Sequence, residues 1–528
     1  IVAGSMFYFR AVTVKLLPFD NKSELQLVLD MPAGTTLEQT QRTLIALAGV
    51  TAGVPEVAAM DLNAGTAAPF NFNGLVRHYF LRRDPNQGDV MVTLAHRSDR
   101  SRSSHEIALA LRQALKAVPL PAGATLAVVE TPPGPPVMAT LLAEIYGPDE
   151  ASRRATAVQV EKLFREVDFI VDVQNSFRTP APELRLVPIR PALDHLAVPE
   201  RQLLDSIGAV MGRQTVGYAA RGGGQSPLPI EVSLDQPDRV WDGSLRATPV
   251  AVAETAVGPR LVELGELVQA SRGEGQPMLF RRNGRAADMV MAELAGTQEA
   301  PIYGMIAVRD AIDGFDWAKA GLVKPVIRLN GQPDEESVPT LLWDGEWEIT
   351  WVTFRDMGGA FMVALLAIYV LVVAQFRSFK VPLVILTPIP LTLVGIVIGH
   401  MLFRAPFTAT SMIGFIALAG IIVRNSILLV DFINHARAPG KPMREVLLEA
   451  GRIRFKPILL TALAAMIGAA TILMDPIFQG LAISLLFGLA SSTLLTVLVI
   501  PAIYIILRDD GVPAGGGPAR LPAGAATT

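Results

Sequence analysis

The residues best placed to do chemistry stand together in the last third of the chain. The apolar, helix-length stretch LAGIIVRNSILLVDF contains one arginine, Arg424, followed by Asn425 and, seven positions after the arginine, Asp431. A guanidinium keeps its proton in a protein, so Arg424 is charged wherever it lies. Ionisable groups inside spanning helices usually mark ion pathways, which predicts a proton relay here. The alternatives are a snorkelling side chain or a simple buried ion pair.

The nearby Asp431 is not the expected partner of Arg424. At 100° per residue the two side chains lie within about 20° of one face, but they are about 10 Å apart along the helix axis. No other long apolar segment has a central Asp, Glu, Lys or Arg, since Asp356 and Asp475 stand at segment ends. The sequence therefore predicts that the carboxylate opposite Arg424 comes from outside this chain.

Five apolar segments are long enough to position this helix in a bilayer, which takes ~20 helical residues to cross. Their expected bounds are 358–376, 381–401, 408–433, 457–474 and 478–507, and three prolines predict a kink in the second. The connections after the first and third segments carry eight Lys and Arg, against one in the opposite loops. The positive-inside rule places those basic connections in the cytoplasm. Residues 15 to 350 then lie on the far side, periplasmic in a two-membrane bacterium.

Composition excludes several classes of protein. The chain has 46 Lys and Arg against 49 Asp and Glu, a net charge of -3, and no long basic stripe, so nucleic acid is not an expected partner. It has no Cys, and its six His show no metal-ligand spacing. No nucleophile motif precedes a helix. We therefore expect no enzyme activity, no metal and no cofactor.

The external part alternates strand-like and helix-like patterns. From about residue 24 to 130 these patterns form two βαβ units, which predicts an α+β, ferredoxin-like sandwich. A similar unit begins at 141–147, is interrupted over about 180–280, and resumes at 288–296. Within the interruption, Gly222, Gly223 and Gly224 are typical of an exposed hairpin tip.

Four long stretches resemble one family. They are VKLLPFDNKSELQLVLDMPAGTTLEQT (14–40), FRRNGRAADMVMAELAG (280–296), GFIALAGIIVRNSILLVDF (414–432) and EAGRIRFKPILLTALAAMIGA (449–469). Together they resemble the C-terminal half of a resistance-nodulation-division (RND) efflux transporter of the hydrophobe/amphiphile (acriflavin resistance) type. The resemblance implies a proton antiporter of the bacterial inner membrane, a homotrimer of full protomers, with a periplasmic adaptor and an outer-membrane channel as partners. It also implies a missing N-terminal half that carries the proton-binding aspartates, with the proton gradient as energy source.

The resemblance also implies roles for individual residues. Arg424, Asn425, Arg454 and Thr461 match the proton relay, with Arg424 in place of a Lys that is common in the family. Because Arg does not exchange its proton, it acts here only as a fixed counter-ion. Aromatic residues in PFNFNGLVRHYF match a loop facing the drug-binding cleft, although a strand face or a subunit contact would equally use them. These residues are Phe70, Phe72, Tyr79 and Phe80, and Gly222–Gly224 match the docking hairpin.

The expected domain organisation follows from both kinds of reasoning. It comprises the end of a truncated membrane helix (1–13), a ferredoxin-like porter subdomain (14–138), a second porter subdomain in two parts (139–180 and 281–340), a docking insertion (181–280), an all-α bundle of five membrane helices (341–507) and a disordered cytoplasmic tail (508–528). Two other functions stay open at this point. One is half of a heavy-metal-exporting RND pump, and the other is a membrane fragment or scaffold that does not transport.

Overall fold

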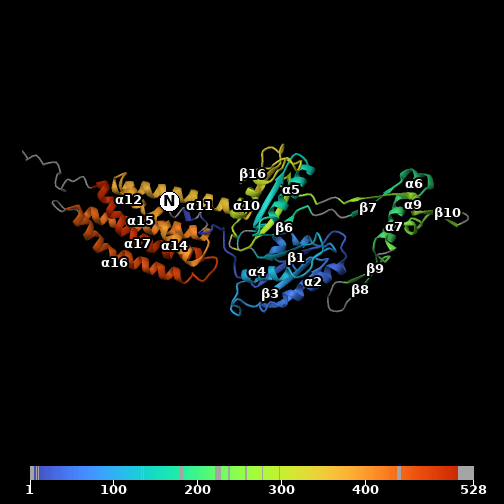
Figure 1. Ribbon diagram of the computed structural model, residues 1–528, viewed down its shortest axis with the longest axis horizontal. Helices are drawn as coiled ribbons and strands as arrows, with labels where there is room; N and C mark the ends of the chain where they lie inside the picture. Colours follow the sequence, from blue (N-terminus) through green and yellow to red (C-terminus); the bar gives the residue numbers. More distant parts are fainter. Residues whose placement is uncertain are drawn as a thin grey trace, which may run out of the picture. The chain divides into compact units, whose positions relative to one another are not determined.

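A computed structural model describes residues 5–6, 9, 11–131, 134, 136–177, 182–220, 227–235, 238–255, 258–275, 278–296, 298–436 and 442–508. It contains a mixed α/β part and five long apolar helices, as expected (Figure 1). The chain forms two compact units, one of Ile1–Arg178 with Met278–Thr528, and one of Thr179–Pro277. The three glycines of the expected docking hairpin, most of the expected truncated helix and the tail from 509 lie outside the described residues.

The first sheet has four antiparallel strands in the order β2-β3-β1-β4. Its elements are β1 (Glu24–Asp30), α2 (Leu37–Thr51), β2 (Val57–Ala64), β3 (Gln87–Leu94), α4 (Ser104–Leu115) and β4 (Thr125–Glu130). Leucines at alternate positions of β1 are buried against both helices. Each helix begins at a side-chain cap, Thr36 for α2 and Ser103 for α4, which satisfies N–H groups of the first turn.

The second sheet has five strands in the order β16-β17-β5-β15-β6. Its elements are β5 (Leu141–Tyr146), α5 (Glu150–Arg165), β6 (Ile170–Asn175), β15 (Asp288–Leu294), α10 (Pro301–Gly314), β16 (Val326–Arg328) and β17 (Thr340–Gly345), with a short hairpin of β13 (Arg281–Arg282) and β14 (Arg285–Ala286) before β15. Its core includes Phe164 and Trp343, whose rings stack at 6.0 Å. Strands β6 and β15 are neighbours although the second compact unit separates them along the chain.

That second unit, Thr179–Pro277, has its own small core. Its elements are β7 (Pro182–Pro188), α6 (Arg190–Leu196), α7 (Glu200–Met211), β8 (Gln214–Ala219), β9 (Leu228–Val232), α8 (Gly243–Arg246), β10 (Pro249–Thr255), β11 (Gly258–Glu263), α9 (Leu264–Leu267) and β12 (Val268–Glu274). Leu203, Leu264 and Leu267 are buried in this core. The strands pair only two by two, and the β8-β9 hairpin exposes Tyr218 and Val232.

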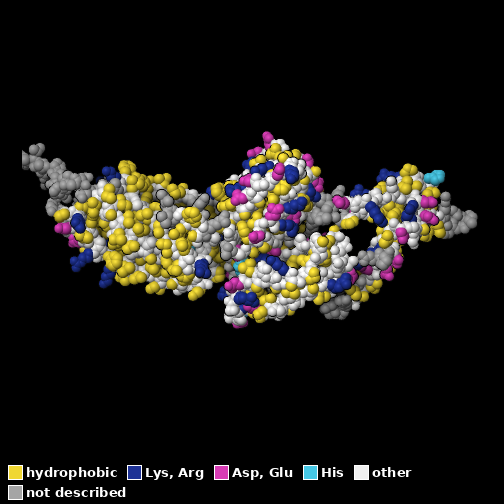
Figure 2. All heavy atoms as spheres, viewed as in Figure 1, with side chains coloured by type: hydrophobic (Ala, Val, Ile, Leu, Met, Phe, Trp, Pro, Cys, Tyr) yellow, Lys and Arg dark blue, Asp and Glu magenta, His cyan; other side chains and the backbone are white. Residues whose placement is uncertain are grey.

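Five helical segments are long and apolar enough to span a membrane. They are α11 (Glu346–Phe376), the broken series α12 (Val381–Leu386), α13 (Pro388–Leu391) and α14 (Leu393–Phe403), and then α15 (Ala409–Ala436), α16 (Met443–Ala470) and α17 (Gln479–Arg508). The second segment is interrupted at Thr387 and Thr392, beside the prolines that predict a kink. Hydrophobic side chains cover the visible surface of this bundle (Figure 2).

Two helices begin well before the apolar segments expected to cross the membrane. Helix α16 begins at Met443 rather than 457, and α11 begins at Glu346 rather than 358. The segment from 443 to 456 was expected to be a basic loop, but it forms the first turns of α16. The error has a physical cause, because an apolar stretch marks the part of a helix that lies in lipid, whereas helical hydrogen bonding continues into water.

Small residues let α17 pack closely against α14 and α15. A Cβ at Gly395 would lie 2.6 Å from the carbonyl oxygen of Phe487, and one at Gly414 would lie 2.7 Å from the Ser484 side chain. Close backbone approach of this kind stabilises helix pairs in membranes. The close packing against α17 fixes the position of α15, the helix that carries Arg424.

Candidate functional site

Arg424 and Asn425 are neighbours on α15 but face different surroundings. Asn425 is buried in the bundle, with 7% of its surface exposed, whereas Arg424 is exposed on the surface of the bundle. Within the described residues, the guanidinium of Arg424 makes no ion pair or hydrogen bond. Asp431 contacts the His435 ring, whose Nδ1 lies 3.5 Å from the carboxylate. In the part of the chain that the structure describes, Arg424 is therefore a cation without a counter-ion on an apolar helix.

The other two predicted relay residues lie on α16. The Arg454 guanidinium lies 5.2 Å from the centroid of the Phe432 ring on α15, and its buried Nε has no hydrogen-bond partner among the described residues. Thr461 is exposed, and its hydroxyl donates to the Pro457 and Ile458 carbonyls of its own helix. No ion pair or hydrogen bond in the described part of the chain joins Arg454 or Thr461 to Arg424.

The four predicted cleft aromatics lie on or beside two short helices, α3 (Phe72–Val76) and the 3-10 helix η1 (Tyr79–Leu81). Phe70 is 71% exposed and lies 6.4 Å from Phe80 between ring centroids. Phe72 is also exposed, whereas Tyr79 packs against the far face of the first sheet. The segment thus presents two exposed rings, those of Phe70 and Phe72. Phe80 is half-buried, and Tyr79 anchors the segment to the sheet.

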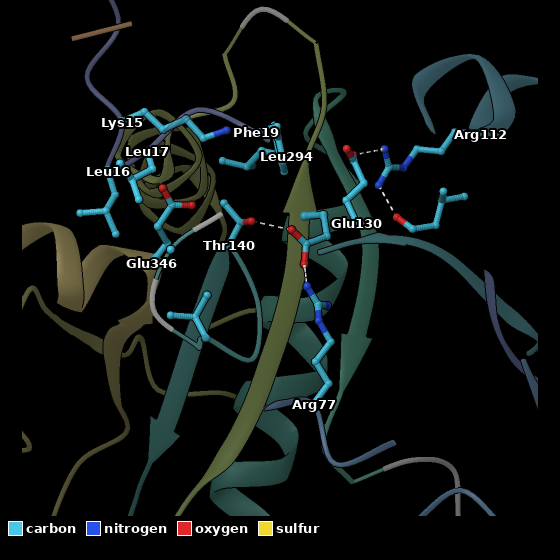
Figure 3. Close-up of a pocket in the computed structure, with 14 residues that line it drawn as sticks. Lys15, Leu16, Leu17, Phe19, Arg77, Arg112, Glu130, Thr140, Leu294 and Glu346 are labelled. Atoms are coloured by element: carbon cyan, nitrogen blue, oxygen red, sulfur yellow. Dashed lines mark hydrogen bonds and ion pairs between the residues drawn. The ribbon is translucent and has the colours of Figure 1, made fainter. Parts of the chain in front are cut away.

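A cavity of about 40 Å³ lies where the first sheet, the second sheet and the start of α11 meet (Figure 3). By volume it has room for about three water molecules. Leu16, Leu17 and Leu294 provide an apolar part of its lining. The charged residues of the lining are Lys15, Arg77, Arg112, Glu130, Glu293 and Glu346.

Four ion pairs join the two sheets around this cavity. Lys15 Nζ lies 3.7 Å from Glu299, Arg77 lies 2.6 Å from Glu293, His105 Nε2 lies 2.7 Å from Glu299, and Arg112 lies 3.1 Å from Asp172. Every cation comes from residues 15–112 and every carboxylate from residues 172–299. In these four pairs the charges of the two surfaces are complementary, while Glu130 of the first sheet adds a carboxylate on the same side as His105 and Arg112.

The carboxylate Glu293 on β15 is held by both sides of the cavity. It accepts hydrogen bonds from Arg77 at 2.6 Å and from the Thr140 hydroxyl at 2.5 Å (Figure 3). Burial by itself would raise the pKa of Glu293, but the Arg77 charge and the Thr140 hydrogen bond outweigh it and lower the pKa below its ordinary value. Glu293 is consequently a charged, buried group at neutral pH.

His105 on α4 is held between two carboxylates. Its Nδ1 lies 3.0 Å from Glu130 and its Nε2 2.7 Å from Glu299, and its ring stacks on Phe19 at 4.3 Å. Burial opposes the charged imidazole, but the two carboxylates raise the pKa of His105 to about 9. The imidazolium therefore joins the two subdomains at neutral pH.

This charged interface was not found from sequence. Arg77 and Glu293 are 216 positions apart, so no local spacing links them. Carboxylates on amphipathic helices and strands are usually solvated, and that general rule favoured an exposed position for each. The single sequence signal was Lys15, a charge within an otherwise apolar stretch that opens the external part.

Comparison with known proteins gives a family match along most of the chain. The profile described as the AcrB/AcrD/AcrF family matches residues 1–302 and 340–508. The swarming motility protein SwrC of Bacillus subtilis is 26% identical over 370 residues, which cover 69% of this chain and 33% of SwrC. Multidrug resistance protein MdtC of Erwinia amylovora is 34% identical over 152 residues, covering 28% of this chain and 15% of MdtC.

A solved structure has a similar fold. A heavy metal efflux pump matches with a TM-score of 0.76 and 19% identity, covering 96% of this chain and 50% of the pump chain. At this identity the likeness shows the fold alone. The chain spans about half the length of that pump and about a third of SwrC.

Proposed function

The chain belongs to the AcrB/AcrD/AcrF family of RND efflux transporters, and from this premise we propose that it is the C-terminal half of a proton-driven pump for hydrophobic or amphiphilic compounds. In this proposal it lies in the bacterial inner membrane and works in a homotrimer of full protomers with a periplasmic adaptor and an outer-membrane channel. It is a secondary active transporter, with the proton gradient in place of a cofactor.

Charge distribution supports the proposed orientation. Basic residues gather where α11 ends, at Arg377 and Lys380, and again in the first turns of α16, including Arg444 and Arg452. The positive-inside rule assigns both places to the cytoplasm. The two sheets are attached at the opposite end of α11 and hence belong to the periplasm.

The order of the first sheet, with two βαβ units, supports a ferredoxin-like porter subdomain. The second sheet is proposed as its partner subdomain, and Thr179–Pro277 as the docking subdomain. In the cleft of the complete pump, the exposed rings of Phe70 and Phe72 and the half-buried ring of Phe80 would make dispersion contacts with varied apolar ligands, with Tyr79 as their anchor.

The single observation that carries the proton-coupled mechanism is the exposed cation on α15. An Arg at bilayer depth costs several kcal/mol unless it is paired or hydrated, and the described helices provide no anion for it. Arg424 is the proposed fixed counter-ion of proton-binding carboxylates on the remaining half. Asn425, Arg454 and Thr461 complete the proposed relay around it.

The test is drug resistance in cells that express this chain together with a polypeptide carrying the remaining helices. We expect Arg424→Ala to abolish export while trimer assembly and membrane level stay unchanged, because the carboxylates lose their counter-ion. Arg424→Lys preserves the charge and is expected to keep export. Unchanged resistance in Arg424→Ala would refute the relay.

A further inference from the structure

A second charged site lies where β17 continues into α11. Three carboxylates surround one guanidinium there. Arg282 Nε lies 3.3 Å from Glu144 Oε1, and its Nη2 lies 3.0 Å from Asp344 and 3.6 Å from Glu348. Within the described residues these carboxylates form no ion pair with any other Lys or Arg. The site therefore has two more negative than positive charges when all groups are ionised.

The fold itself brings the carboxylates together. In the antiparallel pair of β5 and β17, Glu144 is opposite Leu342 and Asp344 is opposite Leu142. Glu144 and Asp344 are thus diagonal neighbours on one face of the sheet, within reach of each other's side chains. Glu348 follows Asp344 by four positions and lies in the first turn of α11. The register of β5 with β17 and the position at which α11 begins therefore bring the three carboxylates together.

One end of this site is buried and the other meets water. Glu144 is 1% exposed, and its Oε2 accepts a hydrogen bond of 2.5 Å from the Tyr146 hydroxyl. Tyr146 in turn accepts one of 2.9 Å from the side-chain amide of Gln332. The other oxygen of Glu144, Oε1, is buried and accepts no hydrogen bond from the described residues, although Arg282 Nε lies 3.3 Å away. The side chains of Arg282 and Glu348 are 43% and 52% exposed, which gives protons a route from solvent.

Charges on the adjoining elements do not neutralise the excess. On β15, Asp288 pairs with Arg154 of α5, and on β14, Arg285 faces Glu336. Glu346, at the first position of α11, lines the separate cavity between the sheets. Two carboxylates without a counter-ion in a poorly solvated place favour the protonated, neutral form over the ionised form. In keeping with this, burial and the hydrogen bond that protonated Glu144 donates to the Asp344 carboxylate raise the pKa of Glu144 to about 8.

We propose that Glu144, Asp344 and Glu348 form a proton-binding site at the start of α11, separate from the Arg424 relay. The ligand is the proton of the solution that bathes the two sheets. When the site loses its proton, like charges on β5, β17 and α11 repel one another, and the junction between sheet and membrane helix is loosened. The bound proton therefore stabilises the contact between the sheet and α11. This site requires neither export nor the remaining half of the pump.

The experiment uses the full chain in lipid nanodiscs and follows the C=O stretch of protonated carboxyl groups by infrared difference spectroscopy between about pH 6 and about pH 10. We expect a carboxyl component that disappears with a midpoint near 8, and Glu144→Gln should lack this component while carboxyl components with lower midpoints remain. Arg282→Met is expected to move the midpoint to higher pH, because the guanidinium favours ionised carboxylates. Glu150→Gln, which changes an exposed carboxylate on α5, is the matched control and leaves the signal unchanged.

Thermal unfolding provides a second measurement. A group whose folded-state pKa is raised binds its proton more tightly in the folded protein, so the melting temperature falls as pH rises toward 8. Glu144→Gln makes this fall smaller, and the part that remains comes from His105, whose pKa is raised to about 9. The Glu150→Gln control retains the full fall. The proposal is overturned if the carboxyl signal survives in Glu144→Gln, if its midpoint lies near the ordinary 4.5, or if Arg282→Met lowers the midpoint.

Discussion

Replacing Arg77 by Met tests the charged interface between the two sheets most directly. Arg77 and Glu293 are 2.6 Å apart with 13% and 12% of their side chains exposed. Removal of one partner of a buried ion pair typically costs about 3–5 kcal/mol, because the other charge stays buried without compensation. Thr140 keeps its hydrogen bond to Glu293. We therefore expect the free energy of unfolding to fall by about 3 kcal/mol, the lower end of that range.

The assay is denaturant unfolding of the full chain in detergent, followed by the fluorescence of Trp317 and Trp343, which are buried in the second sheet's core. A double variant, Arg77→Met with Glu293→Met, removes both charges and is expected to cost about 2 kcal/mol less than the sum of the single variants. Arg201→Met, in a pair with Asp205 that is almost fully exposed, is the control and should change stability by less than about 0.5 kcal/mol. Additive single effects would show that no interaction exists between Arg77 and Glu293.

Three further predictions concern stability. Since the pKa of His105 is raised to about 9, its contribution to stability is present in full below pH 6.5 and is lost as pH rises through about 9. Unfolding at stepped pH should show a smaller loss in His105→Gln than in the wild type, because only the contribution of Glu144 then remains. Gly395→Ala should lower the thermal stability of the bundle by about 1–3 kcal/mol through the clash with Phe487, whereas Gly420→Ala, with open space around it, should not. Ser103→Ala removes the cap of α4 and should cost about 1 kcal/mol in chemical unfolding.

Local features of the fold could be predicted from the sequence because their signals lie within a few residues. Alternating leucines in β1 and the Thr36 and Ser103 caps mark strands and helices by spacing alone. Arg424 could be recognised because its charge contrasts with every neighbour in an apolar helix. Such signals need no knowledge of the tertiary structure.

The charged sites outside the membrane helices could not be predicted, because their members are far apart in sequence. Glu144 and Arg282 meet only through the register of β5 with its neighbours and the position of the β13-β14 hairpin. The start of α16 was missed for a different reason, since hydropathy reports the lipid-facing length and not the hydrogen-bonded length of a helix. Pairing and helix length are properties of the folded chain.

The connection between β17 and α11 contains no spare residue, since the strand ends at Gly345 and the helix begins at Glu346. Gly345 has a φ of 72°, and a Cβ there would lie 2.5 Å from the carbonyl oxygen of Ala139. The strand and the helix are thus joined directly, without a flexible linker between them. A rotation of α11 about its axis would therefore also displace β17. Adding a single residue between β17 and α11 would turn the whole helix by about 100° relative to the sheet, so the length of this connection is tightly constrained.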